Sequence, residues 1–351
     1  SQYACEDADI TFRLFNRFNQ HINQDKTAAQ LLYHLEMPTA QILTQMEHDG
    51  ILIDTYFLGQ LSDEFDKKIM ALQIEAERIA DEPFNLASPK QLGEILFDKL
   101  GIAGGKKTKT GQYATSEAVL SKIEHPLIDV VLEHRSLSKL KSTYTDTLAN
   151  AADEQGRVHT SYHQALTSTG RLSSSEIMGK DISEVTPSER RAAKAVNFGL
   201  LYGMSAFGLA KQIEVDRAVA QDYIKRYFAR YPAILEYMER TKTMAKQLGY
   251  VQTILGRKLY SPDIQSSNRM IKDAAERAAI NAPLQGSAAE IIKLAMIAVD
   301  EVLPKDDAKL LLQVHDELVF EVDTDKAHDI GNLIKTAMQN ALTDTAKKLG
   351  G

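Results

Sequence analysis

Apolar residues recur mostly at spacings of three and four along this chain, a period that predicts a largely helical protein. Residues 1–35 form a polar helical stretch in this pattern. A helix with one apolar face is expected after Pro38 and should end at Gly50, which can take the left-handed backbone of a helix end. Asp54 is placed to cap the next helix, one side of a long antiparallel arm. Its apolar face comprises Leu58, Leu61, Phe65, Ile69 and Leu72.

Alternating apolar and polar residues predict strands in four places. They are a short strand at 51–53, a strand over 157–166, and hairpins at 249–260 and 310–322. A turn that carries one cation is expected at Thr167–Arg171. Further helices are expected over 186–204, 223–248, 271–302 and 327–349. The third of these should be broken at Pro283, because proline removes a helix hydrogen bond.

A second helix start and a basic loop follow the first side of the arm. Ser88 and Pro89 are typical of a capped helix start, and a lysine-bearing loop spans 101–111. This loop lacks the spacing of a nucleotide-binding P-loop, because three residues rather than four separate Gly101 from Gly105. A loop that contacts phosphate and a solvated linker are both open interpretations.

The composition is that of a globular protein, with 44% apolar and 25% charged residues in a chain of 351 that suits two or three lobes. The single cysteine, Cys5, excludes a disulfide scaffold and a cysteine-based zinc site, and suits a reducing, cytoplasmic setting. No apolar run approaches the roughly 18 residues of a membrane helix, so no membrane partner is expected. The net charge of −7 argues against a polyanionic partner.

The charge is distributed unevenly, however. Residues 189–277 hold 16 Lys and Arg against 9 Asp and Glu, whereas the rest of the chain holds 25 against 39. A basic segment inside an acidic protein suits a phosphate or nucleic-acid ligand, but solvated helix surfaces also vary in charge by chance. The placement of the cations has to decide between the two.

One stripe of the helix predicted over 186–204 combines cations with aromatic rings. Residues spaced four apart lie along one slowly drifting face of a helix. Two cations suit a triphosphate, and two rings suit a base or a sugar. The alternative is a half-buried helix whose cations extend to solvent and whose rings pack in the core. The four residues are Arg190, Lys194, Phe198 and Tyr202.

A second stripe is polar throughout. Arg277, Asn281 and Gln285 are again four apart, and all three side chains can hydrogen-bond to nucleic-acid edges or phosphates. Pro283 should bend the helix that carries them. The alternative is an ordinary solvated helix face.

The hairpin at 310–322 places two carboxylates at the apex of an apolar element. Apolar residues should alternate along both of its strands, with His315, Asp316 and Glu317 between them. Desolvating two adjacent carboxylates is costly without a counter-charge, which a divalent cation would supply. Oxygen ligands suit Mg²⁺, which also borrows phosphate oxygens from its substrate. The alternative is an acidic turn without a metal.

Taken together, these residues resemble the polymerase portion of the bacterial family A DNA polymerases. The resemblance runs over nearly all 351 residues, and the matching segments stand in family order. The segments are STYTDTL at 142–148, HTSYHQALTSTGRLSS at 159–174, RRAAKAVNFGLLYGMSAFGLA at 190–210, ERAAINAPLQG at 276–286 and QVHDELVFEV at 313–322.

The resemblance implies an α+β fold shaped as a right hand of thumb, palm and fingers, mostly helical with an antiparallel palm sheet. Residues 1–35 resemble the end of a 3′–5′ exonuclease-like domain whose other metal-binding motifs are absent. Family chains continue past this C-terminus with a further strand. The implied domains are thumb and adjoining palm at 38–145, palm at 146–186, fingers at 187–260 and palm at 261–351.

The resemblance also implies which residues bind the incoming dNTP and the metal. Arg190 and Lys194 would hold the triphosphate, and Lys194 would act in catalysis. Phe198 would pack on the sugar and base. Asp316 would be a metal ligand with Glu317 beside it, and both would act in catalysis. His315 would lie by the nucleotide at the primer end, and Tyr202 at the templating base.

For DNA, the resemblance implies contacts along the primer–template duplex. Arg171 would reach the minor groove at the primer terminus, and Lys141 the DNA backbone. Tyr202 would also touch DNA at the templating base. The second stripe would line the minor groove and the primer–template terminus: Arg277, Asn281 and Gln285.

The resemblance breaks directly after Ser174. Several dozen family residues are missing near 174–175, including a palm strand with the first catalytic aspartate in a pattern close to Asp-Tyr-Ser-Gln-Ile-Glu. That aspartate normally bridges both ions of a two-metal site, whose ions lie about 3.5–4 Å apart. Either the sequence joins segments of a longer chain, or the chain carries a true deletion, which would expose a sheet edge.

The expected function is therefore template-directed DNA synthesis. The chain would add dNTPs to a primer 3′-hydroxyl with two Mg²⁺ ions, in DNA repair and replication. Primer–template DNA and dNTPs would be its partners, and it would work as a monomer in the bacterial cytoplasm, associated with the nucleoid. If the missing strand is a true deletion, the alternative is a catalytically inactive, DNA-binding polymerase fold.

Overall fold

A computed structural model describes residues 2–108, 111–175, 205–212 and 216–348. Contacts within the chain define two compact units. The smaller unit is Gly50–His159, and the larger one combines Ser1–Asp49 with Thr160–Gly351. The domain limits implied by the family resemblance divide the chain differently and stay predictions.

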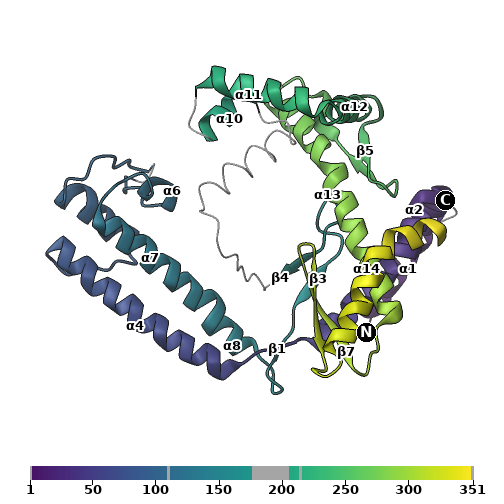
Figure 1. Cartoon of the computed structure of the whole chain (residues 1–351), viewed down its shortest axis with the longest axis horizontal. Helices are drawn as coiled ribbons and strands as arrows, with labels where there is room; N and C mark the ends of the chain where they lie inside the picture. The colour runs from purple at the N-terminus through teal and green to yellow at the C-terminus, as the bar shows by residue number, and fades with distance from the viewer. Residues whose placement is uncertain (1, 109–110, 176–204, 213–215, 349–351) are drawn as a thin grey trace. The chain divides into compact units, whose positions relative to one another are not determined.

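The smaller unit is built on two long helices, α4 (Thr55–Ala80) and α7 (Pro126–Leu140), which lie side by side in Figure 1. They run antiparallel, because the end of α4 packs on the start of α7, and this confirms the predicted arm. Its short elements are α5 (Pro89–Gly93), α6 (Glu117–Leu120), α8 (Thr147–Ala151), the π-helical η2 (Glu94–Lys99) and η3 (Lys141–Asp146), and the antiparallel strands β1 (Ile51–Leu52) and β2 (Arg157–Val158).

Side-chain caps start the helices of this unit where the sequence predicts. The Asp54 carboxylate accepts the amide of Phe57 at 2.8 Å, and the Ser88 hydroxyl accepts the amide of Gln91. Gly50 has φ +60°, the left-handed conformation expected at the preceding helix end. The core of the unit lies where the end of α4 meets the start of α7 and the short elements between them. It comprises Ala76, Ala80, Phe84, Leu86, Leu92, Ile95, Leu96, Leu120, Leu127, Ile128 and Val131.

The larger unit is also mainly helical, with three small antiparallel sheets (Figure 1). Its helices are α1 (Gln2–Gln24), α2 (Lys26–Leu31), the π-helical η1 (Leu32–Glu36), α3 (Met37–Asp49), α10 (Ala206–Gln212), α11 (Arg217–Arg230), α12 (Pro232–Leu248), the 3₁₀ turn η4 (Pro262–Gln265), α13 (Arg269–Val302) and α14 (Ala327–Lys348). Its strand pairs are β3 (Ser161–His163) with β4 (Ser173–Ser175), β5 (Tyr250–Gln252) with β6 (Lys258–Tyr260), and β7 (Ala308–Val314) with β8 (Glu317–Val322).

Helix α13 organises this unit. It packs against α14, α12, α3 and the β5–β6 hairpin. Its Met296 joins Ile42, Leu43 and Met46 of α3 and Leu310 of β7 in one apolar cluster. The apolar face predicted for the helix after Pro38 is therefore the one that packs.

Three predictions of secondary structure are wrong. The strand over 157–166 is split into β2 and β3, which pair in different sheets. The helix over 223–248 is two helices, because Tyr231 precedes Pro232 and leaves the helical region with φ −126° and ψ 64°. Conversely, α13 runs unbroken through Pro283. Packing on several neighbours compensates there for the one hydrogen bond that proline removes. The helix predicted over 186–204 lies outside the described residues.

By length and composition alone, α13 is long and apolar enough to cross a membrane. Of its most apolar window, 44% is buried inside the structure. The core helix of a soluble protein passes the same test, so this finding by itself does not indicate a membrane span.

Two glycines in helices predict substitutions of opposite effect. A Cβ atom at Gly286 of α13 would lie 2.6 Å from Thr253 Cγ2 and 3.3 Å from the carbonyl oxygen of Thr169, whereas a Cβ at Gly331 of α14 would touch nothing within 4 Å. Gly286→Ala should cost about 1–3 kcal/mol through overpacking. Gly331→Ala should gain about 0.5–1 kcal/mol of helix propensity. Thermal unfolding of both variants measures this, and a rise in Tm for Gly286→Ala would contradict the close packing.

Candidate functional site

The four residues of the first stripe, Arg190, Lys194, Phe198 and Tyr202, lie outside the described residues. Their predicted roles therefore stay predictions. In the larger unit, the other predicted groups are the polar face of α13, the turn at Arg171 and the apex of the β7–β8 hairpin. Lys141 belongs to the smaller unit and is described by itself.

The polar face of α13 exists as the spacing predicts. Arg277 is exposed, and Asn281 and Gln285 are half-buried on the same helix. The Asn281 Oδ1 atom is buried and accepts no hydrogen bond from the part of the chain that the structure describes. A buried acceptor without a partner costs about 1–3 kcal/mol.

The turn before Arg171 also exists as predicted. Gly170 has φ +76°, and its amide donates to the Thr167 carbonyl at 3.2 Å. The Thr167 hydroxyl donates to the carbonyl of Arg171 at 2.7 Å. Arg171 is exposed, so the turn presents one cation at the surface.

The β7–β8 hairpin is confirmed, but its apex differs from the expectation. Val314 pairs with Glu317, so His315 and Asp316 form a two-residue turn in which His315 has φ +55°. His315, Asp316 and Glu317 are all exposed. The desolvation argument for a metal is therefore wrong, because water solvates these carboxylates.

The strict alternation predicted for the hairpin is wrong in β7. The register shifts between Leu310 and Leu312, a bulge that buries four consecutive residues from Leu310 to Gln313. In β8, Leu318 and Phe320 do share one face, as predicted. The bulge lies in the strand that leads into the apex.

Two carboxylates at one apex fit Mg²⁺, which binds one or two protein carboxylates together with substrate phosphates. Among the described residues, no group of three or more His, Cys, Asp and Glu side chains could hold a metal. Asp316 and Glu317 can therefore supply only part of a two-metal site. Their role as metal ligands stays a prediction from the family resemblance.

Lys141 of the smaller unit lies between two carboxylates. Its Nζ is 2.9 Å from Asp146 Oδ2 and 3.3 Å from Asp66 Oδ2. The hydrogen bond to Asp146 raises the pKa of Lys141. The predicted contact of Lys141 with the DNA backbone stays a prediction.

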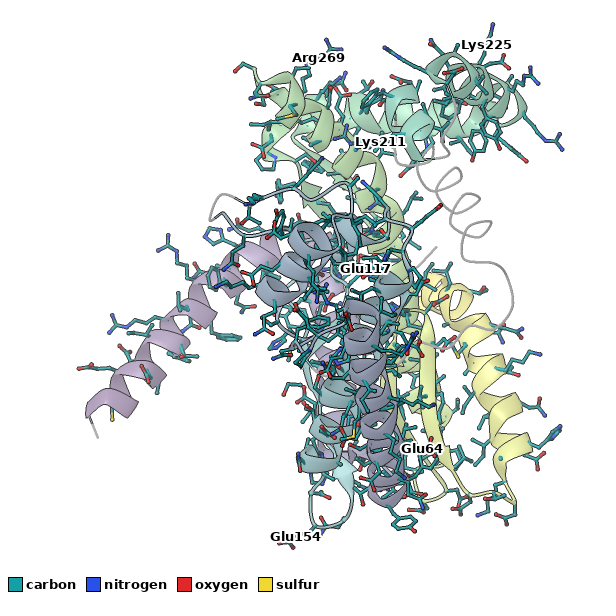
Figure 2. The ribbon with its side chains drawn as sticks, turned by 90° about the vertical axis from the view of Figure 1, so that its left-hand side faces the viewer. Glu64, Glu117, Glu154, Lys211, Lys225 and Arg269 are labelled. Carbon is teal, nitrogen blue, oxygen red and sulfur yellow. The ribbon has the colours of Figure 1, made fainter. Side chains whose placement is uncertain are left out.

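The basic segment presents cations at the surface of the larger unit. Lys211 on α10, Lys225 on α11 and Arg269 at the start of α13 are exposed, and Figure 2 labels them. The smaller unit holds 17 Asp and Glu against 13 Lys and Arg, and Figure 2 labels three of its exposed acids: Glu64, Glu117 and Glu154. The net charge of the whole chain thus conceals a cationic region.

A charge network that was not predicted above lies on the packed side of α13. It is partly buried and comprises Glu36, Arg257, Glu290 and Lys293. Arg257 Nε lies 2.9 Å from Glu290 Oε1, and Arg257 Nη2 donates to Glu36 Oε1. Lys293 Nζ lies 2.9 Å and 3.0 Å from the two oxygens of Glu36. Glu290 and Lys293 are each only 1% exposed. These charges are therefore removed from water and must compensate one another.

Neighbouring charges set the protonation of this network. Burial opposes ionisation of Glu36, but the charges of Lys293 and Arg257 outweigh it and hold the pKa of Glu36 below its usual range. Burial lowers the pKa of Lys293 even though Glu36 lies beside it. The pKa of Arg257 is raised, because Glu36 and Glu290 outweigh the effect of burial.

The one sequence signal that could have revealed the network is a pair of charges inside an apolar run. Glu290 and Lys293 interrupt the apolar residues of α13 and follow Gly286 by about one and two turns. Charged residues on the buried face of a helix need partners. Glu36, the partner of Lys293, is 257 residues away from it in sequence, which no local pattern indicates.

Comparison with known proteins shows which class of protein this chain belongs to. Residues 55–178 and 174–349 match the model of DNA polymerase family A. The chain has the fold of a polymerase domain: it is similar to the POL domain of Pol1 from M. smegmatis, solved in complex with DNA primer-template and dNTP, with a TM-score of 0.80 and 34% identity over 96% of this chain and 71% of that one. The α+β right-hand fold implied by the resemblance is thereby confirmed.

The chain belongs to DNA polymerase family A. It is 43% identical to DNA polymerase I of Pseudomonas aeruginosa over 97% of this chain and 45% of that protein. It is 39% identical to DNA polymerase I of Rhizobium leguminosarum over 97% of this chain and 41% of that protein. The chain thus spans less than half the length of these curated relatives.

Two features of these alignments concern residues that the relatives have and this chain lacks. The match with the Pseudomonas protein extends over 414 positions, although this chain has only 351 residues. At several dozen positions, therefore, the relative has a residue and this chain has none. The two segments that match the family model meet at residues 174–178.

Protonation of Glu36 should weaken the fold. Because its folded-state pKa lies below the ordinary value of 4.5, its contribution to stability is present above about pH 4.5 and is lost as pH falls through the folded-state pKa. Glu36→Gln should therefore show a smaller fall in unfolding free energy between about pH 5 and 3 than the wild type. Glu239→Gln, which removes an exposed carboxylate paired with Lys242, is the control and should keep the wild-type slope. Equal slopes for Glu36→Gln and the wild type would contradict the assignment.

Proposed function

We propose that these residues are the polymerase part of a template-directed DNA polymerase, which adds dNTPs to the 3′-hydroxyl of a primer. Membership of DNA polymerase family A supports the reaction class. The similar POL domain of Pol1 holds primer–template and dNTP, which supports both partners. The observation that carries the proposal is the convergence of two predicted DNA-contacting segments: Gly286, next to Gln285, lies against Thr169, two residues before Arg171.

In this proposal, the surface that carries Arg171, Arg277 and Gln285 binds the minor groove near the primer terminus. Arg171 and Arg277 supply exposed positive charge for a phosphate backbone or a base edge. The amides of Asn281 and Gln285 carry both donors and acceptors, which suits the acceptors and the guanine amino group of the minor groove.

The incoming dNTP would bind along the stripe that lies outside the described residues. Arg190 and Lys194 would contact the triphosphate, and Phe198 the sugar and base. Tyr202 would lie at the templating base. His315 would lie beside the nucleotide from its position in the turn between β7 and β8. These assignments rest on the family resemblance.

Asp316 and Glu317 would hold Mg²⁺ together with the nucleotide phosphates. When bound, Mg²⁺ lowers the pKa of the attacking 3′-hydroxyl and neutralises the charge of the leaving pyrophosphate. The exposed apex of the β7–β8 hairpin leaves both carboxylates accessible to a metal and to a primer end. A complete two-metal site needs the further aspartate that the family carries after the position of Ser174. We propose that the complete protein supplies it, as a member of DNA polymerase family A.

We further propose that the protein acts as a monomer in the bacterial cytoplasm, in DNA repair and replication. The support is the bacterial origin of the relatives named above.

Primer extension with Mg²⁺ tests the function. The purified protein should extend a primer only with complementary dNTPs, and Asp316→Ala should lower the rate by on the order of a hundredfold or more, because a metal supplies several kcal/mol to such a reaction. DNA affinity should stay close to wild type, since cations elsewhere hold the duplex. Asp325→Ala, which removes another exposed carboxylate just beyond β8, is the control and should extend normally.

The mass of the intact protein should be measured beside activity. A protein of 39.0 kDa that binds primer–template but incorporates no nucleotide would reject the enzyme proposal for this chain. Full activity of Asp316→Ala would reject the metal role.

A further inference from the structure

We infer that Arg257 and Glu290 are positioning residues for DNA: together they fix the turn that carries Arg171 against α13, the helix that carries Asn281 and Gln285. This inference rests on the proposed function and adds to it two residues that contact neither DNA nor nucleotide.

Arg257 lies between the two segments. On one side its guanidinium binds the Glu290 carboxylate of α13, with Nε 2.9 Å from Oε1. On the other side it lies against Gly170, where a Cβ atom would be 3.5 Å from Arg257 Cζ. Gly170 is the residue before Arg171, and Glu290 is about one turn after Gln285. The guanidinium thus spans the gap between the two predicted DNA contacts.

The β5–β6 hairpin that carries Arg257 is itself fastened to α13. The Thr253 hydroxyl donates to Glu290 Oε1 at 2.9 Å and accepts the amide of Arg257 at 3.0 Å. The amide of Ile254 donates to the Ser287 hydroxyl at 3.0 Å. The hairpin therefore has a fixed position on the helix, and the direction of Arg257 is fixed with it.

The segment leading into the turn is fastened to the same network. Gln164 donates to both the carbonyl oxygen, at 2.8 Å, and the carboxylate of Glu36. Glu36 in turn binds Arg257 and Lys293. The residues from Gln164 to Gly170 are thus held at both ends, while Arg171 itself is exposed. Among the residues that the structure describes, none pairs with the Arg171 side chain, so the backbone of the turn sets its position.

The chemistry of the network suits positioning more than stability. Taking ions out of water is costly, and apolar side chains of similar volume are often as stabilising as a buried ion pair. A guanidinium, however, is planar and presents donors in a fixed fork, so it can hold two carboxylates in one orientation. A lysine at position 257 would keep the charge but lose the fork. Arg257→Lys should therefore move the turn without removing charge.

A binding cycle between protein and DNA variants separates positioning from folding. The DNA change is 3-deazaguanine at the primer terminus, which replaces the N3 acceptor of the minor groove with a C–H group. Kd is measured for both DNAs with the wild type, Arg171→Ala, Arg257→Lys and Glu290→Gln, and Tm for each protein. Lys258→Ala is the matched control, because it is the adjacent residue of β6 and pairs with Asp25 at the surface.

The wild type and Lys258→Ala should lose about tenfold in affinity on the DNA change, the effect of losing one hydrogen bond from a charged donor. Arg171→Ala, Arg257→Lys and Glu290→Gln should each bind the two DNAs about equally. A variant that is only destabilised would have a lower Tm but would keep the tenfold loss.

A tenfold loss retained by both Arg257→Lys and Glu290→Gln would overturn the inference, as would the absence of any loss in the wild type. Primer extension by the wild-type protein is measured separately. Extension without the expected pattern of affinities rejects the positioning role and leaves the proposed function standing, whereas the expected affinities without extension reject the enzyme proposal and leave the positioning role standing.

Discussion

Four charged side chains, two of them buried and two partly buried, hold the elements of the larger unit together. Glu36, Arg257, Glu290 and Lys293 come from a π-helical segment, a hairpin and the long helix α13, and each needs the others because burial removes water from the charges. Gly286 permits the close approach that this network requires, since a larger residue would meet Thr253 and the Thr169 backbone. The ion pairs and the close packing at Gly286 together set the distance between α13 and the turn at Arg171.

The distribution of charge in the larger unit bears on the proposed binding of DNA. The chain has a net charge of −7, but exposed cations lie on α10, α11 and the start of α13, and two more are Arg171 and Arg277. The buried network uses its own cations against its own acids, so it adds little to the external field. The part of the protein that we propose to bind DNA is therefore organised by internal ion pairs and presents exposed cations outward.

Local rules in the sequence predicted local structure well. Caps at Asp54 and Ser88, the left-handed Gly50 and the hairpin near Gly256 are all present, because neighbours in sequence decide them. The unbroken α13 was missed because packing outweighs a proline. The network was missed because its contacts join residues up to 257 positions apart. The roles of Asp316 and Lys194 are implied by the family resemblance, and no local rule provides them. The desolvation argument at the apex of the β7–β8 hairpin is wrong, because its carboxylates are exposed to water.

Amide hydrogen exchange in the wild type and Glu290→Gln tests most directly whether the network holds the two segments together. Removing the Glu290 charge weakens the contacts of Arg257 and Thr253. The account predicts faster exchange both in the hairpin at 250–260 and in the turn at 164–171, with exchange in the β7–β8 hairpin unchanged. Faster exchange confined to the 250–260 hairpin, with the turn as protected as in the wild type, would contradict it.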